Sequence, residues 1–83
     1  MNEPIDLLET IRVADGVFCL LPLHRQRMQS ACRELYGCVA PELSLTPADI
    51  PREFRRGVVK CRVAYGREIV NVEFERYEPR RIN

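Results

Sequence analysis

The residues best suited to chemistry lie in one stretch, Leu20 to Gly37 (LLPLHRQRMQSACRELYG), which the apolar spacing predicts to be a helix with Pro22 in its first turn. His24 falls on the apolar side of this helix, and Arg27 lies one residue to the side, near the helix start. An arginine there adds a planar charged fork to the positive end of the helix dipole, and this combination suits a phosphate. On periodicity alone, a solvated arginine beside a core stripe is the more common arrangement. The predicted stripe consists of Met28, Ala31, Cys32 and Leu35.

The sequence also contains two kinds of potential nucleophile, one lysine and four cysteines. Lys60 is the only lysine, and therefore the only candidate for a Schiff base, but the sequence supplies no pocket around it. We interpret Lys60 as a residue on the polar face of a strand. The four cysteines form no C-x-x-C pair and are not spaced with His24 as zinc ligands would be. A Cys/His nucleophile pair is formally possible, yet nothing places a cysteine beside His24, and Cys32 and Cys61 are predicted to be small core residues.

Composition narrows the function classes. Eighty-three residues, 46% of them hydrophobic and 30% charged, predict one small globular domain, and a net charge of +1 gives no field that attracts nucleic acid or membrane. The arginine pairs Arg55-Arg56 and Arg80-Arg81 could contact RNA, but the glutamates between and around them favour solvated faces. The longest apolar run, Val17 to Leu23, is too short to span a bilayer, and no signal peptide pattern is present. A reduced, cytoplasmic location is expected.

The elements that position these residues can be predicted from alternation and turn signals. Period-two patterns predict four strands, joined as two hairpins by Ala14-Asp15-Gly16 and by the two-residue turn Gly66-Arg67. Thr46 is predicted to cap a short second helix that ends by Arg56 and is broken by Pro51. The order is β-β-α-(α)-β-β, an α+β fold of antiparallel hairpins on one main helix. The predicted strands are Leu7–Val13, Val17–Leu21, Val58–Tyr65 and Glu68–Tyr77.

Three further motifs stand out in this sequence. The first is the strand L-E-T-I-R-V at residues 8–13, followed by Asp15-Gly16, and the second is the helix H-R-Q-R-M-Q-S-A at residues 24–31. The third is the hairpin V-K-C-R-V-A-Y with its exit Y-E-P-R-R-I at residues 77–82. Together these motifs resemble the class IV aminotransferase family, whose members are pyridoxal-phosphate enzymes of fold type IV and include aminodeoxychorismate lyase-like and branched-chain aminotransferase-like proteins. Leu8 departs from the family, which usually has an aromatic residue there.

The resemblance implies roles for named residues. The arginine of the H-x-x-R motif, here Arg27, would bind the phosphate of pyridoxal 5'-phosphate. Leu8, Thr10 and Arg12, which alternate along the first strand, would line the substrate side, and Arg12 suits a substrate carboxylate because arginine can pair with it through two hydrogen bonds. The implied substrate is a small amino acid or an aminodeoxychorismate-type molecule, and the implied assembly is a homodimer.

One departure from the family bears on mechanism. Family members carry the Schiff-base lysine in a second domain, downstream of the segment that ends here, and Lys60 does not match that motif. We therefore expect residues 1–83 to be one domain, the N-terminal small domain of a two-domain enzyme, truncated at Asn83 and not competent in catalysis alone. The resemblance does not choose between transaminase and lyase chemistry. The alternative hypothesis is a non-catalytic module that dimerises through an apolar face.

Overall fold

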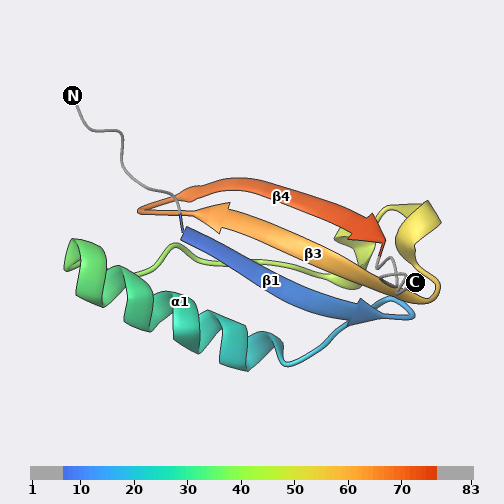
Figure 1. Cartoon of the computed structure of the whole chain (residues 1–83), viewed down its shortest axis with the longest axis horizontal. Coiled ribbons are helices and arrows are strands. Elements are labelled where there is room, and N and C mark those ends of the chain that lie inside the picture. Colours follow the sequence, from blue (N-terminus) through green and yellow to red (C-terminus); the bar gives the residue numbers. More distant parts are fainter. Residues whose placement is uncertain (1–6, 77–83) are drawn as a thin grey trace, which may run out of the picture.

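A computed structural model describes residues 7–76, and it has the expected α+β architecture (Figure 1). Four strands form one antiparallel sheet in the order β2-β1-β3-β4. The long central pair, β1 and β3, runs in register from Leu7 opposite Tyr65 to Ala14 opposite Val58. Residues 77–82, the exit of the third motif, lie outside the described residues. The strand bounds are Leu7–Ala14 for β1, Val17–Phe18 for β2, Val58–Tyr65 for β3 and Ile69–Arg76 for β4.

Both hairpin turns form, but neither has the predicted bounds: β1 includes Ala14, so the first turn consists of Asp15 and Gly16 alone. Asp15 and Gly16 have φ angles of 48° and 81°, the left-handed conformation that a two-residue turn between β1 and β2 requires. The prediction that β2 continues to Leu21 is wrong, because Leu20 turns the chain with a φ of 55° directly into the helix. The predicted two-residue turn of the second hairpin is also wrong. A register shift at Ala64/Tyr65 makes residues 66–68 the loop, and β4 starts at Ile69.

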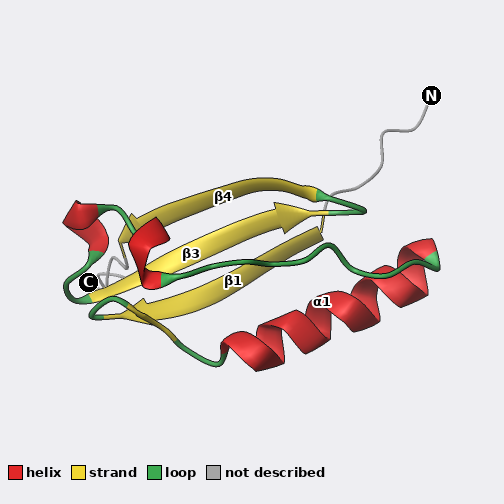
Figure 2. Cartoon of the chain, turned by 180° about the vertical axis from the view of Figure 1, so that it is seen from behind, coloured by secondary structure: helices red, strands yellow, loops and turns green. Residues whose placement is uncertain are grey.

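The predicted helix is α1, Leu21–Tyr36, and it lies alongside the edge of β1 that faces away from β3 (Figures 1 and 2). It ends at Gly37, whose φ of 63° allows its N–H to bond the carbonyl of Arg33 at 3.1 Å. Met28 and Cys32 of the predicted stripe are buried, whereas Leu35 is 62% exposed. The prediction is therefore wrong for Leu35, because the side of α1 that packs against the sheet is narrower than the predicted apolar stripe.

The segment between α1 and β3 covers one face of the sheet, crossing in front of the strands in Figure 2. Its predicted second helix is two separate 3-10 turns, Pro47–Asp49 and Arg52–Phe54, with Pro51 between them. Asp49 accepts the backbone N–H of Thr46 at 2.7 Å, as the capping pattern predicted. The buried core lies between this segment, α1 and the face of the sheet that the segment covers. It consists of Ile11, Val13, Met28, Cys32, Leu43, Ile50, Val59, Cys61, Val63 and Tyr65.

The two faces of the sheet therefore differ. We call the face covered by residues 38–57 the inner face, and the other the outer face. No described segment crosses the outer face (Figure 1). Its side chains come from alternate positions paired across three strands, and they are mainly polar: Leu8, Thr10 and Arg12 on β1, Lys60, Arg62 and Ala64 on β3, and Asn71, Glu73 and Glu75 on β4.

Candidate functional site

The most unusual side chain of the inner face is Glu9 of β1. It alternates with the core residues Ile11 and Val13, and its side chain is only 6% exposed. Two basic side chains of α1 reach it, one to each carboxylate oxygen. His24 Nδ1 lies 3.3 Å from Glu9 Oε2, and Arg27 Nη2 lies 3.5 Å from Glu9 Oε1. A buried carboxylate is stable when it is paired in this way, and we call these three residues the Glu9 cluster.

His24 stands out within the Glu9 cluster because its contact is close but poorly directed. Its side chain is 12% exposed, and its backbone N–H bonds the carbonyl of Leu20 at 3.1 Å, within the first turn of α1. Nδ1 is buried, yet it makes no hydrogen bond of good geometry with any described residue, although Glu9 Oε2 is at ion-pair distance. Buried polar atoms without a hydrogen bond are rare, and each one calls for an explanation, such as a role in binding or catalysis.

Arg27 has one side toward Glu9 and the rest toward solvent. Its side chain is 64% exposed, so a ligand can reach the guanidinium while Glu9 holds it from behind. Tyr65 of β3 is 3% exposed and belongs to the same electrostatic neighbourhood. Burial raises the pKa of the Tyr65 hydroxyl, the Glu9 carboxylate raises it further, and the Arg27 guanidinium opposes both. The arrangement is therefore a buried carboxylate that holds a solvent-accessible guanidinium.

The three predicted substrate-side residues lie elsewhere. Leu8, Thr10 and Arg12 point to the outer face, opposite to Glu9, and all three are exposed. The structure thus brings these three together but does not bring Arg27 onto their face. From Leu7 to Ile11, the side of β1 that faces away from β3 has no strand partner among residues 7–76, since β2 pairs only with the last two positions of β1.

Lys60 lies on the outer face, as its position in the strand pattern predicted. Its Nζ is 3.5 Å from Glu75 Oε1 on the neighbouring strand, and its side chain is 31% exposed. Arg62 Nη1 contacts the same oxygen at 3.5 Å. A surface ion pair of this kind contributes little to stability. The Lys60 amine also does not lie in a desolvated pocket of the kind that a lysine needs to react with a carbonyl at neutral pH.

The two buried cysteines and Arg55 have structural roles. Cys32 and Cys61 are fully buried, as predicted, and burial raises the pKa of the Cys61 thiol to about 11. The Cys32 thiol donates to the carbonyl of Gly66, so the charged neighbour of His24 is Glu9 rather than a cysteine. Arg55 Nε donates to the carbonyl of Ile50 at 2.8 Å, which ties this arginine to the loop of its own segment. Arg80 and Arg81 lie outside the described residues.

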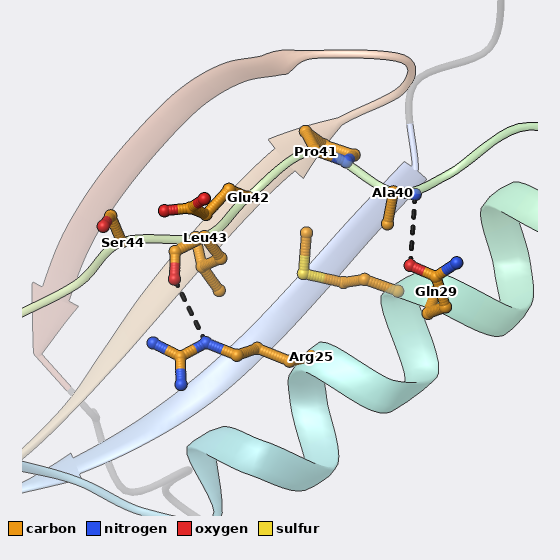
Figure 3. A pocket seen from close by; sticks show the side chains of 8 residues that line it. Arg25, Gln29, Ala40, Pro41, Glu42, Leu43 and Ser44 are labelled. Atoms are coloured by element: carbon orange, nitrogen blue, oxygen red, sulfur yellow. Dashed lines mark hydrogen bonds between the residues drawn. The ribbon is translucent and has the colours of Figure 1, made fainter.

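A separate pocket of about 400 Å³ opens between α1 and the segment that follows it (Figure 3). Two hydrogen bonds join its walls: Arg25 Nε donates to the carbonyl of Leu43 at 3.1 Å, and the N–H of Ala40 donates to Gln29 Oε1 at 3.2 Å. None of the residues predicted to form the site lines it. Its lining consists of Arg25, Met28, Gln29, Ala40, Pro41, Glu42, Leu43 and Ser44.

Comparison with protein-family models, curated proteins and solved structures returns no match to this chain. Within residues 7–76, no group of His, Cys, Asp and Glu side chains is placed to hold a metal ion. The described part of the chain also has no helix long and apolar enough to cross a membrane. The geometry of the site is therefore the main basis for inferring what it does.

Sequence reasoning missed the part played by Glu9. The alternation of Leu8, Thr10 and Arg12 implies that Glu9 lies on the opposite side with Ile11 and Val13, as the structure has it, but no function was assigned to Glu9. The signal was available: a single carboxylate on an otherwise apolar face is expensive to bury, so a partner was to be expected. Which cation would reach Glu9 depends on how α1 lies against β1, and periodicity does not give that.

Proposed function

We propose that this chain is part of a pyridoxal-phosphate enzyme of the class IV aminotransferase type, in which Arg27 contacts the cofactor phosphate. The observation that carries the proposal is the Glu9 cluster: a 64% exposed guanidinium held from behind by a carboxylate that is 6% exposed. Because an exposed ion pair contributes little to stability and ordering a long side chain costs entropy, stability alone does not explain this pair. Together with the H-x-x-R motif, the fixed guanidinium supports phosphate binding.

Leu8, Thr10 and Arg12 are proposed to form part of the substrate wall. Since these residues and the Glu9–Arg27 contact lie on opposite faces of β1, the cofactor and substrate would have to pass the edge of β1 along which α1 lies. The phosphate would be at the Arg27 side, and a substrate carboxylate would be at the Arg12 side, where two hydrogen bonds to one guanidinium are available. The substrate is proposed to be a small amino acid or an aminodeoxychorismate-type molecule.

The residues of this chain fit the phosphate end of the cofactor and not its reactive end. When bound, the cofactor supplies an electron sink for carbanion chemistry, and a lysine must hold it. Lys60 is the only lysine and pairs with Glu75 on the outer face. We infer that the holding lysine belongs to a further domain and that this chain alone neither retains the cofactor nor catalyses a reaction. A cytoplasmic location is part of the proposal.

The proposal predicts an absorbance result. The 83-residue chain mixed with millimolar pyridoxal phosphate should not develop the absorbance of a lysine-bound cofactor, whereas a protein extended past Asn83 should develop it. In the extended protein, Arg27→Gln should weaken cofactor affinity about tenfold or more, because a charged hydrogen bond is lost. Arg33→Gln, which removes an exposed arginine of the same helix, is the matched control. A strong signal from the short chain that Lys60→Met abolishes would overturn the assignment.

A non-catalytic module that dimerises is the second candidate, and the outer face favours it. This face is not covered by any described segment and includes Leu8 and Val58, which are 54% and 37% exposed. A homodimer is also proposed for the enzyme, so dimerisation alone does not separate the two functions. The absorbance experiment does separate them, because a purely structural module extended past Asn83 would not retain the cofactor.

A further inference from the structure

The Glu9 cluster raises a question that the proposed phosphate contact leaves open: why a carboxylate should lie directly behind a guanidinium that binds an anion. By charge alone, Glu9 weakens the attraction of Arg27 for phosphate. Its side chain is also 6% exposed, and its neighbours Ile11 on β1 and Val63 on β3 are core residues, so an apolar residue would be easier to accommodate there. A carboxylate at this position therefore calls for a role other than stability.

We propose that Glu9 is a positioning residue, which fixes the direction of the Arg27 guanidinium and the proton position on the His24 ring. This inference rests on the proposed phosphate contact of Arg27. Each carboxylate oxygen of Glu9 contacts one partner: Oε1 lies 3.5 Å from Arg27 Nη2, and Oε2 lies 3.3 Å from His24 Nδ1. One rigid strand residue thus determines where two helix side chains lie.

The contact with Glu9 has a defined chemical consequence for His24. A carboxylate can only accept hydrogen bonds, so Nδ1 must carry the proton when it approaches Oε2. In a neutral ring the other nitrogen, Nε2, is then an acceptor, and in a charged ring it is a second donor. Nδ1 lies close to Oε2, at 3.3 Å, although the direction of the contact is not that of a good hydrogen bond.

The other titratable groups near the Glu9 cluster do not replace Glu9 as the partner of His24 and Arg27. Tyr65 on β3 and Cys32 on α1 both have raised pKa values because they are buried, so both stay protonated and neutral near pH 7. Tyr36 of α1 also acts on Tyr65 electrostatically. Neither Tyr65 nor Cys32 adds a charge that could replace Glu9 as the partner of Arg27.

The ligand-free chain tests the positioning role directly by ¹⁵N NMR. In the 83-residue chain at pH 8, the ring nitrogens of His24 should show the proton on Nδ1, and the Arg27 Nε–H should be motionally restricted. In Glu9→Gln both signatures should be lost, because an amide can present either its oxygen or its NH₂ group to Nδ1. Glu75→Gln, which removes a carboxylate from the ion pairs of Lys60 and Arg62, should leave both signatures unchanged.

Titration with sulfate separates positioning from simple charge. If Glu9 acts by positioning, Glu9→Gln should bind sulfate about threefold or more weakly at Arg27, although a negative charge has been removed. Tighter binding, or an unchanged His24 proton position, would overturn the positioning role. Glu9→Asp is a second variant that can be used if Glu9→Gln does not fold. It keeps the charge but moves the carboxylate oxygens away from both partners, so it should show the same losses. Sulfate that never shifts the Arg27 signals in the wild-type chain would instead contradict the proposed phosphate contact, whatever the His24 signals show.

Discussion

At the scale of single residues, the free energy of burying Glu9 explains why its two partners lie so close. A buried carboxylate without a partner costs several kcal/mol, and removing one partner of a buried ion pair typically costs about 3–5 kcal/mol. Arg27 is 64% exposed, so solvent already screens much of that pair, and His24 Nδ1 lacks a well-directed hydrogen bond. The Glu9 cluster is thus weakly stabilising for its degree of burial, as expected of a site retained for function.

Replacing Glu9 with leucine should leave the free energy of unfolding unchanged within about 1 kcal/mol or raise it, because an apolar side chain of similar size suits the inner face. Glu9→Ala should instead lower it by about 2 kcal/mol, because a cavity remains beside Ile11. Urea denaturation followed by circular dichroism would measure both. A loss well above 2 kcal/mol in Glu9→Leu would mean that Glu9 is retained for stability.

The buried thiol of Cys61 makes stability depend on alkaline pH. Its pKa is about 11 in the folded chain against an ordinary value of 9.0, so above pH 9 the unfolded chain releases this proton while the folded chain retains it. The unfolded state then binds fewer protons, and stability falls as pH rises from 9 to 11, by on the order of 2 kcal/mol. The raised pKa values of Cys32 and Tyr65 act in the same direction. Urea midpoints at pH 8, 9, 10 and 11 should fall steadily, and less in Cys61→Val; midpoints independent of pH would contradict the argument.

At the scale of elements, the local signals in the sequence were sufficient wherever a turn or cap residue fixed the backbone. Gly37 ends α1, and Asp15 with Gly16 forms the first hairpin turn, as their types indicated. Errors came where tertiary structure decides. The register shift at Ala64/Tyr65 pairs Tyr65 with Ile69 and leaves residues 66–68 as the second hairpin loop, and periodicity carries no record of this shift. The outer-face position of Thr10 followed from alternation, whereas its relation to Arg27 depends on how α1 docks, which the sequence did not predict.

The docking of α1 makes a quantitative prediction about two residues of the sequence-predicted stripe. Met28 is 1% exposed and should lose about 3 kcal/mol of unfolding free energy when changed to alanine, because a core cavity remains. Leu35, one of the same predicted set, is 62% exposed, and Leu35→Ala should cost less than about 0.5 kcal/mol. Chemical denaturation of the two variants would decide. Equal losses would mean that α1 presents the wider stripe that periodicity predicted.

At the scale of the whole molecule, the sheet is covered on one side only. Residues 38–57 and α1 shield the inner face, whereas the outer face meets solvent across three strands in the described chain (Figures 1 and 2). The charges of this face partly compensate one another, since Lys60 and Arg62 share the Glu75 carboxylate. A face of this kind, with Leu8 at one end and ion pairs in the middle, suits a partly polar contact with another domain or subunit.

The proposed homodimer can be tested on this face. If the outer face forms the contact, the 83-residue chain should sediment as a dimer at high concentration, and Leu8→Glu should shift it to monomer, because an unpaired acidic side chain would then be buried within the contact. Leu35→Glu places the same charge on the exposed side of α1 and should leave the dimer intact. A wild-type chain that remains monomeric at every concentration would remove the dimer proposal for this chain. A dimer that only Leu35→Glu disrupts would move the contact to α1.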